Sequence, residues 1–146
     1  HGCAATWLTG TYDPEARLLY WTTGNPCPDY NGDERKGDNL YTSSILALKP
    51  KTGKLVWYYQ VTPHDVHDFD AQQVPMLIDA DYRGARRKLL VQASRNGFFY
   101  VLDRESGKLL SAAPYLEKLT WASGIDAAGR PIRVPGTTPS LEGSKA

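Results

Sequence analysis

Apolar residues recur along the chain in short runs of strand length that are rich in β-branched and aromatic side chains. Gly, Asn, Asp and Pro separate these runs, as is typical of turns between strands. No segment keeps an apolar period of 3.6 residues, so we expect no long helix. The runs expected to form strands are 6–12, 18–23, 41–48, 55–61, 89–93 and 98–102. The pattern therefore predicts an all-β chain.

A strand–turn–strand unit recurs along the sequence. Residues 46–57 indicate a strand, a tight Lys-Thr-Gly-Lys turn and a second strand that closes on Trp57. Residues 100–110 repeat this pattern with Ser111 where the Trp would fall, and residues 11–21 are a looser version. Hairpin units that return every ~40–55 residues are typical of propeller blades. Three partial units would leave sheet faces and edges uncovered, so residues 1–120 are predicted to form two to three blades of a larger β-propeller.

The chain changes character after about residue 120, where Gly, Pro and Ser become more frequent. Residues 121–146 are therefore predicted to be an irregular connecting segment, and the last of them to be disordered or cut from a longer chain. The sequence also begins at His1 without a Met, as an excerpt would.

Charge and composition exclude some partners. The net charge is +1 over 146 residues, which gives no field that would attract nucleic acid or an anionic membrane. No apolar run approaches the ~20 residues of a membrane-spanning helix. One local basic group is interpreted as a solvated hairpin tip. It consists of Arg83, Arg86, Arg87 and Lys88.

Two cysteines, Cys3 and Cys27, lie in no metal-binding spacing. They could form one disulfide or remain two buried thiols, and the sequence leaves both possibilities open. In either case we expect a structural role.

Residues 62–70 read Thr-Pro-His-Asp-Val-His-Asp-Phe-Asp and carry the densest group of acidic and imidazole side chains. Hard cations prefer several oxygen ligands, and a base beside a cation can stay ionised at neutral pH. The Pro favours a rigid loop at a strand end. His64 and His67 are joined by no thiol or third His, so we do not expect a zinc site. His64 is instead expected to brace the loop.

A second acidic stretch, residues 29–33, has the oxygen spacing that begins an EF-hand loop. Its sixth position is Glu34 rather than Gly, and its twelfth is Leu40 rather than Glu, so the calcium loop is excluded. We interpret Asp29, Asn31 and Asp33 as turn residues, and Asp38 and Asn39 as loop braces.

Five segments in order resemble the pyrroloquinoline quinone (PQQ) alcohol dehydrogenases. Residues 47–57, Ala-x-x-x-x-Thr-Gly-Lys-x-x-Trp, resemble the tryptophan-docking motif of that family. Residues 7–14 with 23–31, then 37–42, 62–70 and 95–100, follow the family's order and spacing. The similarity spans residues 5 to about 132. It implies an eight-bladed propeller of which this chain would be roughly a quarter.

The resemblance also implies roles by position. Trp7 matches the floor beneath the planar quinone, and Asn25 matches an amide-oxygen ligand of the active-site cation. Asp68 matches the catalytic base, and Arg95 matches the group that hydrogen-bonds the reactive quinone carbonyl. Taken alone, Trp7 would be a core or blade-interface residue, Asn25 a turn residue and Arg95 a hairpin flank. The implied reaction oxidises primary alcohols to aldehydes by hydride transfer to PQQ, with a metal ion as Lewis acid.

The cation is expected to be Ca²⁺ or a light lanthanide. Asp70 lies two residues after Asp68, where the lanthanide-using branch of the family carries a carboxylate and calcium-using members commonly do not. A trivalent ion gains more from an added anionic oxygen, and a strand-like step of two would point both carboxylates to one side. We therefore hypothesise a cation held by Asn25, Asp68 and Asp70, with a light lanthanide preferred; the alternative is that Asp70 is a solvent-facing loop residue. The family's Glu ligand and adjacent-cysteine ring lie outside this chain.

Other implications concern the surroundings of the enzyme. His67 occupies a place where many members carry Trp, which should alter the local shape of the substrate pocket, and Cys27 replaces a small apolar residue. The family implies a periplasmic location and a cytochrome c electron acceptor. The alternative is a non-enzymatic propeller scaffold. It would keep residues 47–57 but would have no reason to keep Asn25, Asp68 and Arg95 together.

Overall fold

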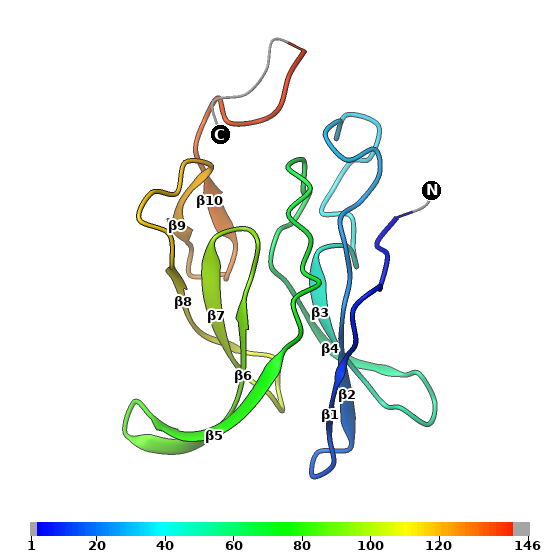
Figure 1. Cartoon of the computed structure of the whole chain (residues 1–146), viewed down its shortest axis with the longest axis vertical. Coiled ribbons are helices and arrows are strands. Elements are labelled where there is room, and N and C mark those ends of the chain that lie inside the picture. The colour runs from blue at the N-terminus through cyan, green and yellow to red at the C-terminus, as the bar shows by residue number, and fades with distance from the viewer. Residues whose placement is uncertain (1–2, 142–146) are drawn as a thin grey trace.

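The computed structural model describes residues 3–141, which form strands joined by turns and loops (Figure 1). The all-β prediction is confirmed. One four-stranded antiparallel sheet contains β1–β4 in sequence order, a second contains β5–β8, and β9 pairs with β10. The strands are β1 (Thr11–Asp13), β2 (Leu18–Thr22), β3 (Ser44–Leu48), β4 (Leu55–Gln60), β5 (Met76–Tyr82), β6 (Ala85–Ala93), β7 (Phe98–Asp103), β8 (Leu109–Pro114), β9 (Ala122–Ile125) and β10 (Pro131–Arg133).

The two sheets lie side by side and bury one face of each in a shared core (Figure 1). In β2, residues Leu18, Tyr20 and Thr22 are buried and the residues between them are partly exposed, because successive side chains of a strand point to opposite faces. Tyr20 crosses to the second sheet, where its hydroxyl donates to the carbonyl of Arg104 at 2.8 Å. Further core residues are Ile45, Ala47, Trp57, Leu90, Phe98, Tyr100 and Leu102. Each sheet is therefore one blade of a partial propeller, as predicted.

The sequence repeat corresponds to the β3–β4 hairpin of the first sheet and the β7–β8 hairpin of the second. Trp57 pairs with Ala47 in the first sheet, and Ser111 pairs with Val101 in the second, with a register shift directly after Ala47 and Val101 in the two sheets. Residues 11–21, which we expected to belong to a third unit, are β1 and β2 of the first sheet. The looser match follows from its position in the sheet, because residues 11–21 form the β1–β2 hairpin of this blade whereas residues 46–57 form its β3–β4 hairpin.

The repeated unit also explains how the sheets pack. Trp57 lies over Gly107, the turn glycine of the second sheet. A Cβ atom added there would be 2.5 Å from ring atom Cδ2 of Trp57. Only a residue without a side chain permits this contact, and Gly107 also has a φ of +73°, which glycine adopts without strain.

Three expectations need correction or comment. The predicted strand 6–12 is too long at its start, since β1 is Thr11–Asp13, and the chain before it pairs through residues 3–5 with the loop after β2. β5 was not predicted, since its two aspartates interrupt the apolar run. The segment after residue 120 was predicted to be irregular but contains the β9–β10 hairpin, closed by Asp126 and Arg130. The expected disorder at the end falls on residues 142–146, outside the described range.

Two features of the surface agree with the sequence. Arg83 and Arg86 are exposed at and beside the turn between β5 and β6, as expected of a hairpin tip, whereas Arg87 and Lys88 are partly buried further along β6. Within residues 3–141, no helix is long and apolar enough to cross a membrane.

Candidate functional site

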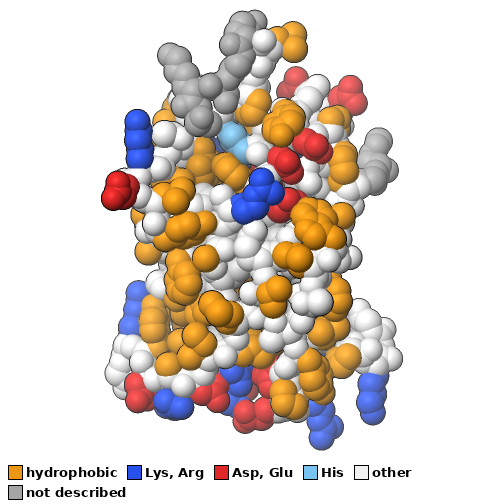
Figure 2. Space-filling model, viewed as in Figure 1, with side chains coloured by type: hydrophobic (Ala, Val, Ile, Leu, Met, Phe, Trp, Pro, Cys, Tyr) orange, Lys and Arg blue, Asp and Glu red, His pale blue; other side chains and the backbone are white. Residues whose placement is uncertain are grey.

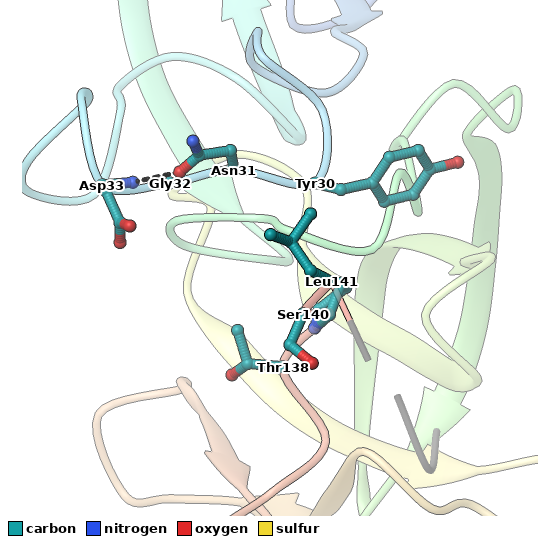
Figure 3. Close-up of a pocket in the computed structure, with 8 residues that line it drawn as sticks. Tyr30, Asn31, Gly32, Asp33, Thr138, Ser140 and Leu141 are labelled. Carbon is teal, nitrogen blue, oxygen red and sulfur yellow. Dashed lines mark hydrogen bonds between the residues drawn. The ribbon is translucent and has the colours of Figure 1, made fainter. Parts of the chain in front are cut away.

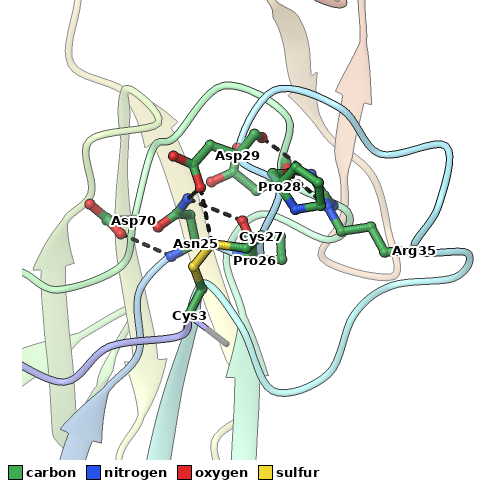
Figure 4. The surroundings of a disulfide bond; sticks show 9 residues. Cys3, Asn25, Pro26, Cys27, Pro28, Asp29, Arg35 and Asp70 are labelled. Carbon is green, nitrogen blue, oxygen red and sulfur yellow. Dashed lines mark hydrogen bonds between the residues drawn. A yellow bond between two sulfur atoms is a disulfide. The ribbon is translucent and has the colours of Figure 1, made fainter. Parts of the chain in front are cut away.

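The first described residues are bound to the loop that follows β2 (Figure 4). Cys3 and Cys27 form a disulfide with their Cα atoms 5.6 Å apart, which decides between the two possibilities left open by the sequence. The amide of Ala4 donates to the carbonyl of Asn25 at 2.8 Å. These contacts fix the chain just before Trp7. The Trp7 side chain is 59% exposed, so its ring is not the core residue that composition alone would suggest.

The side-chain amide of Asn25 has a defined orientation in this loop. Its Nδ2 donates to the carbonyl of Pro26 at 3.1 Å and to Oδ1 of Asp29 at 2.9 Å, as Figure 4 shows for Asp29. Both amide hydrogens are thereby used. The carbonyl oxygen of the side chain is left as the group that could bind a cation.

Asp70 connects this loop to a third segment. It is 3% exposed, and its Oδ1 accepts the backbone N–H of Asn25 at 2.9 Å. Its Oδ2 accepts Nη1 of Arg95 at 3.0 Å. Gly24 makes room for this arrangement, since a Cβ there would be 2.7 Å from Oδ1 of Asp70. The structure thus brings together three of the predicted site residues from three separate segments.

Asp68 lies in a loop organised by Asp65, not in a strand. The buried carboxylate of Asp65 accepts the backbone N–H of His67 at 2.8 Å and of Phe69 at 2.9 Å. Asp68 and Asp70 have φ values of +58° and +53°, so the predicted strand-like step between them is wrong. The capping by Asp65 turns the backbone around Asp68 and replaces strand pairing.

The electrostatics of this loop favour a bound cation. Burial raises the pKa of Asp68, and the neighbouring charge of Asp70 raises it further. Burial also raises the pKa of Asp70, against the opposing effects of the Asn25 N–H and Arg95. The Arg95 side chain is 55% exposed and compensates only part of this charge. Two carboxylates and an oriented amide oxygen are donors that suit a hard cation.

Arg95 also lines a cavity of about 300 Å³ between the Asp68 loop and the segment before β9. His67 stacks on Phe69 with ring centroids 4.9 Å apart, and Trp121 closes the group by donating Nε1–H to the carbonyl of Asn96 at 2.8 Å. The imidazole of His67 is further hydrogen-bonded to the carbonyl of Thr137 at 2.8 Å. The cavity wall beside Arg95 is therefore largely aromatic and held in place.

The remaining sequence candidates have structural roles. Nδ1 of His64 lies 2.8 Å from the carbonyl oxygen of Gly37, which confirms that it braces the loop. Asn31 accepts the N–H of Asp33 at 3.0 Å, as expected of a turn residue. The stretch around Asn31 lines another cavity, of about 510 Å³, together with residues 138–141 (Figure 3). Within residues 3–141, Cys3, Cys27 and Asp29 lie close enough together to suggest a metal site. Their ligand atoms are instead engaged in the disulfide and in hydrogen bonds of the loop.

Two residues near the site were missed by the sequence reasoning. Asp65 was counted as part of an acidic cluster, although an Asp whose carboxylate can reach N–H groups two and four residues later is a known capping pattern. No sequence pattern marked Arg35 as important, because its partners are backbone carbonyls from separate parts of the sequence. These partners belong to Pro28, Asp29 and Asp65.

Comparison with known proteins places the chain in a family. Residues 1–114 match the family model described as "PQQ: Glucose/ethanol/alcohol dehydrogenase, beta-propeller domain". The chain is 50% identical to quinoprotein alcohol dehydrogenase PedH of Pseudomonas putida KT2440, covering 99% of this chain and 24% of that protein. It is 52% identical to quinohemoprotein alcohol dehydrogenase ADH IIB of Pseudomonas putida, covering 92% of this chain and 20% of that protein.

Solved structures agree with this comparison. A europium-containing methanol dehydrogenase superposes with a TM-score of 0.90 at 39% identity, covering 95% of this chain and 24% of that one. Quinohemoprotein alcohol dehydrogenase from Comamonas testosteroni gives a TM-score of 0.90 at 40% identity, covering 96% and 21%. The chain thus spans a fifth to a quarter of its relatives' length. Because the matched residues make up most of it, this chain belongs to the β-propeller domain family of the PQQ-dependent glucose, ethanol and alcohol dehydrogenases.

Proposed function

We propose that the protein to which this chain belongs is a periplasmic PQQ-dependent dehydrogenase that oxidises primary alcohols to aldehydes. The observation that carries the proposal is the contact of Asp70 with both Asn25 and Arg95, next to the loop of Asp68. A propeller scaffold needs no such meeting of three segments. The periplasmic location and a cytochrome c electron acceptor are part of the proposal and rest on the family.

Each residue has a role that its surroundings support. Asp68 accepts the hydroxyl proton of the alcohol, as a partly desolvated carboxylate with a raised pKa can do. Arg95 presents a half-exposed guanidinium that can donate hydrogen bonds to an oxygen that gains negative charge. Trp7 offers an uncovered aromatic face for stacking a planar ring. When bound, PQQ supplies the hydride acceptor and the cation supplies a Lewis acid.

The cation in this proposal is held by Asn25, Asp68 and Asp70, and a light lanthanide is preferred over Ca²⁺. Asp70 adds a second buried carboxylate, and a trivalent ion gains more from that charge than a divalent ion does. The europium-containing methanol dehydrogenase among the similar structures supports this choice. The Glu expected from the family would come from another part of the protein.

Reconstitution tests the activity. Full-length protein would be loaded with PQQ and either La³⁺ or Ca²⁺, then assayed on a panel of primary alcohols with an artificial dye as electron acceptor. Turnover that requires both PQQ and a metal is the expected result. No turnover under any condition, with PQQ bound, would favour the scaffold alternative.

A single substitution tests the metal. La³⁺ should activate wild-type protein at concentrations where Ca²⁺ does not, and Asp70→Ala should reverse that order because the added carboxylate is gone. If Ca²⁺ alone activates the wild type, the lanthanide preference is wrong, while the alcohol dehydrogenase activity stands.

A further inference from the structure

Arg35 lies in the long loop between β2 and β3, and its guanidinium joins two other parts of the chain. Nε donates to the carbonyl of Pro28 at 3.0 Å, and Nη2 donates to the carbonyl of Asp29 at 3.2 Å. The same Nη2 donates to the carbonyl of Asp65 at 2.7 Å. Residues 28–29 follow Asn25, whereas residue 65 begins the loop of Asp68. One side chain therefore fixes the distance between these two loops.

The residues that Arg35 holds are those that orient the proposed cation ligands. Asp29 accepts Nδ2 of Asn25 at 2.9 Å and so directs the Asn25 carbonyl oxygen away from itself. Asp65 accepts the N–H groups of His67 and Phe69, the two residues that flank Asp68. A shift of either backbone would move a ligand, although Arg35 touches neither ligand.

The guanidinium is itself fixed in one orientation. Nη1 donates to Oδ1 of Asn39 at 2.6 Å, and Nδ2 of Asn39 donates back to the carbonyl of Arg35 at 2.7 Å. Asn39 has a φ of +59°, which suits Asn and Gly. Because four donor contacts diverge from one planar group, Lys could keep the charge but not the geometry.

We propose that Arg35 is a positioning residue that sets the geometry of the cation site by fixing the Asn25 loop against the Asp68 loop. This inference rests on the proposed function, since it concerns the same site. Partners of metal ligands that are not ligands themselves are known to tune affinity strongly.

Metal binding tests the proposal without relying on turnover. Full-length protein loaded with PQQ and stripped of metal would be titrated with La³⁺ in a chelator buffer. Tb³⁺ luminescence lifetimes in H₂O and D₂O would count the water molecules on the bound ion. The variants are Arg35→Lys and, as a matched control, Arg130→Lys. Arg130 forms a two-pronged pair with the carboxylate of Asp38, in the same long loop as Arg35, and makes no hydrogen bond to residues 25–29 or 65–70.

The expected results distinguish a loss of ligand positioning from a general loss of stability. Arg35→Lys should weaken La³⁺ binding about 10–100-fold and admit about one additional water molecule to bound Tb³⁺. Arg130→Lys should change affinity by no more than about twofold. If Arg35→Lys does not fold, Asn39→Gly is the second variant. It removes the side chain that holds the Arg35 guanidinium, glycine tolerates the φ of +59° at this position, and La³⁺ binding should again be weaker.

Two outcomes would overturn the inference. One is wild-type affinity and water count in Arg35→Lys, which would reduce Arg35 to a replaceable positive charge. The other is an equal loss in Arg35→Lys and Arg130→Lys, which would indicate general destabilisation. If wild-type protein binds neither La³⁺ nor Tb³⁺, the proposed cation site fails, and this inference fails with it.

Discussion

An arginine–carboxylate pair lies at each end of β7, and the two pairs differ in burial. Arg95 precedes the strand and pairs with Asp70 at 3.0 Å, whereas Arg104 follows it and pairs with Asp13 at 2.8 Å. Both carboxylates are buried. The Arg104 side chain is 7% exposed, however, while the Arg95 side chain is 55% exposed.

The buried arginine pairs with carboxylates from two different strands. Arg104 also pairs with Asp79 at 2.7 Å, and Asp13 accepts the N–H groups of Glu15 and Ala16. Figure 2 shows charged side chains gathered at the lower end of the view, with apolar side chains over much of the face above. Arg104 and Asp13 connect the two sheets at the end opposite the site.

The site end is arranged differently. Arg95 is half-exposed and pairs with Asp70, and its charge also lowers the pKa of Asp68, but burial outweighs this effect and raises the pKa of both carboxyl groups. The two ends thus differ in the burial of the cationic partner, which is buried in the structural ion pair and half-exposed at the proposed cation site.

Breaking the buried pair should have the largest effect on stability. Arg104→Met leaves Asp13 buried without its cation, and removing one member of such a pair destabilises a protein by about 3–5 kcal/mol. The expected result is a much lower midpoint of urea unfolding in full-length protein. A loss no larger than that of an exposed arginine, such as Arg86→Met, would contradict the contrast between the two ends.

Asp68→Asn should affect the reaction instead of the fold. Loss of the base should lower turnover on the order of 10²-fold or more, while PQQ binding stays close to wild type. Steady-state assays with PQQ and metal, together with a PQQ titration, measure the two effects. Near-normal turnover would refute the assignment of Asp68 as the base.

The same variant should change stability in a pH-dependent way when metal is absent. The folded pKa of Asp68 is raised, so folding favours its protonated form, and the unfavourable burial of its charge grows as pH rises through that pKa. Metal-free Asp68→Asn should therefore be more stable than wild type at neutral pH, with the difference fading in acid. A constant difference across pH would show that charge is not the cause.

Much of the fold could be predicted because the repeated hairpin is a local pattern. The turn of residues 49–54 recurs 54 positions later with the same backbone bonds, Gly53 to Lys49 and Gly107 to Asp103. β5 escaped prediction because its aspartates are exposed on an edge strand, so no apolar run marks it. Residues 6–12 were expected to be a strand, but only Thr11–Asp13 is one, and the residues before it that pair, 3–5, do so with a loop, which has no sequence period.

The candidate site could be predicted as a set of residues but not as a geometry. Asn25, Asp68, Asp70 and Arg95 were proposed because their segments resemble a family in order. The positive φ values at Asp68 and Asp70 depend on capping by Asp65, and the spacing of the loops depends on Arg35. Long-range contacts to backbone carbonyls leave no compositional trace, which is why these supporting residues were missed.

Gly107→Ala should have an intermediate effect on the packing between the sheets. The new Cβ would be 2.5 Å from the Trp57 ring, and overpacking of this kind destabilises by about 1–3 kcal/mol. Gly53→Ala is the matched control, since Gly53 has a similar φ of +69° and nothing in the described part of the chain within 4 Å of its Cβ. Urea midpoints of the two variants give the comparison. Equal losses would contradict the role assigned to Trp57.

The smallest effect is expected at the exposed pair of Asp38 and Arg130, near the site end. Hydrogen bonding to Arg130 lowers the pKa of Asp38, so folding favours the charged carboxylate. This stabilisation is present above the ordinary Asp pKa of about 3.9 and is lost as pH falls through the lowered folded value. Arg130→Gln should therefore be less stable than wild type at neutral pH by about 0.2–1 kcal/mol, and equal to it in strong acid. Thermal midpoints from pH 7 downward measure the difference, which should also shrink in high salt because both side chains are exposed. A difference that persists below the folded pKa would mean that Arg130 acts through packing, and the contrast with the buried pair of Arg104 would then lie in geometry instead of charge.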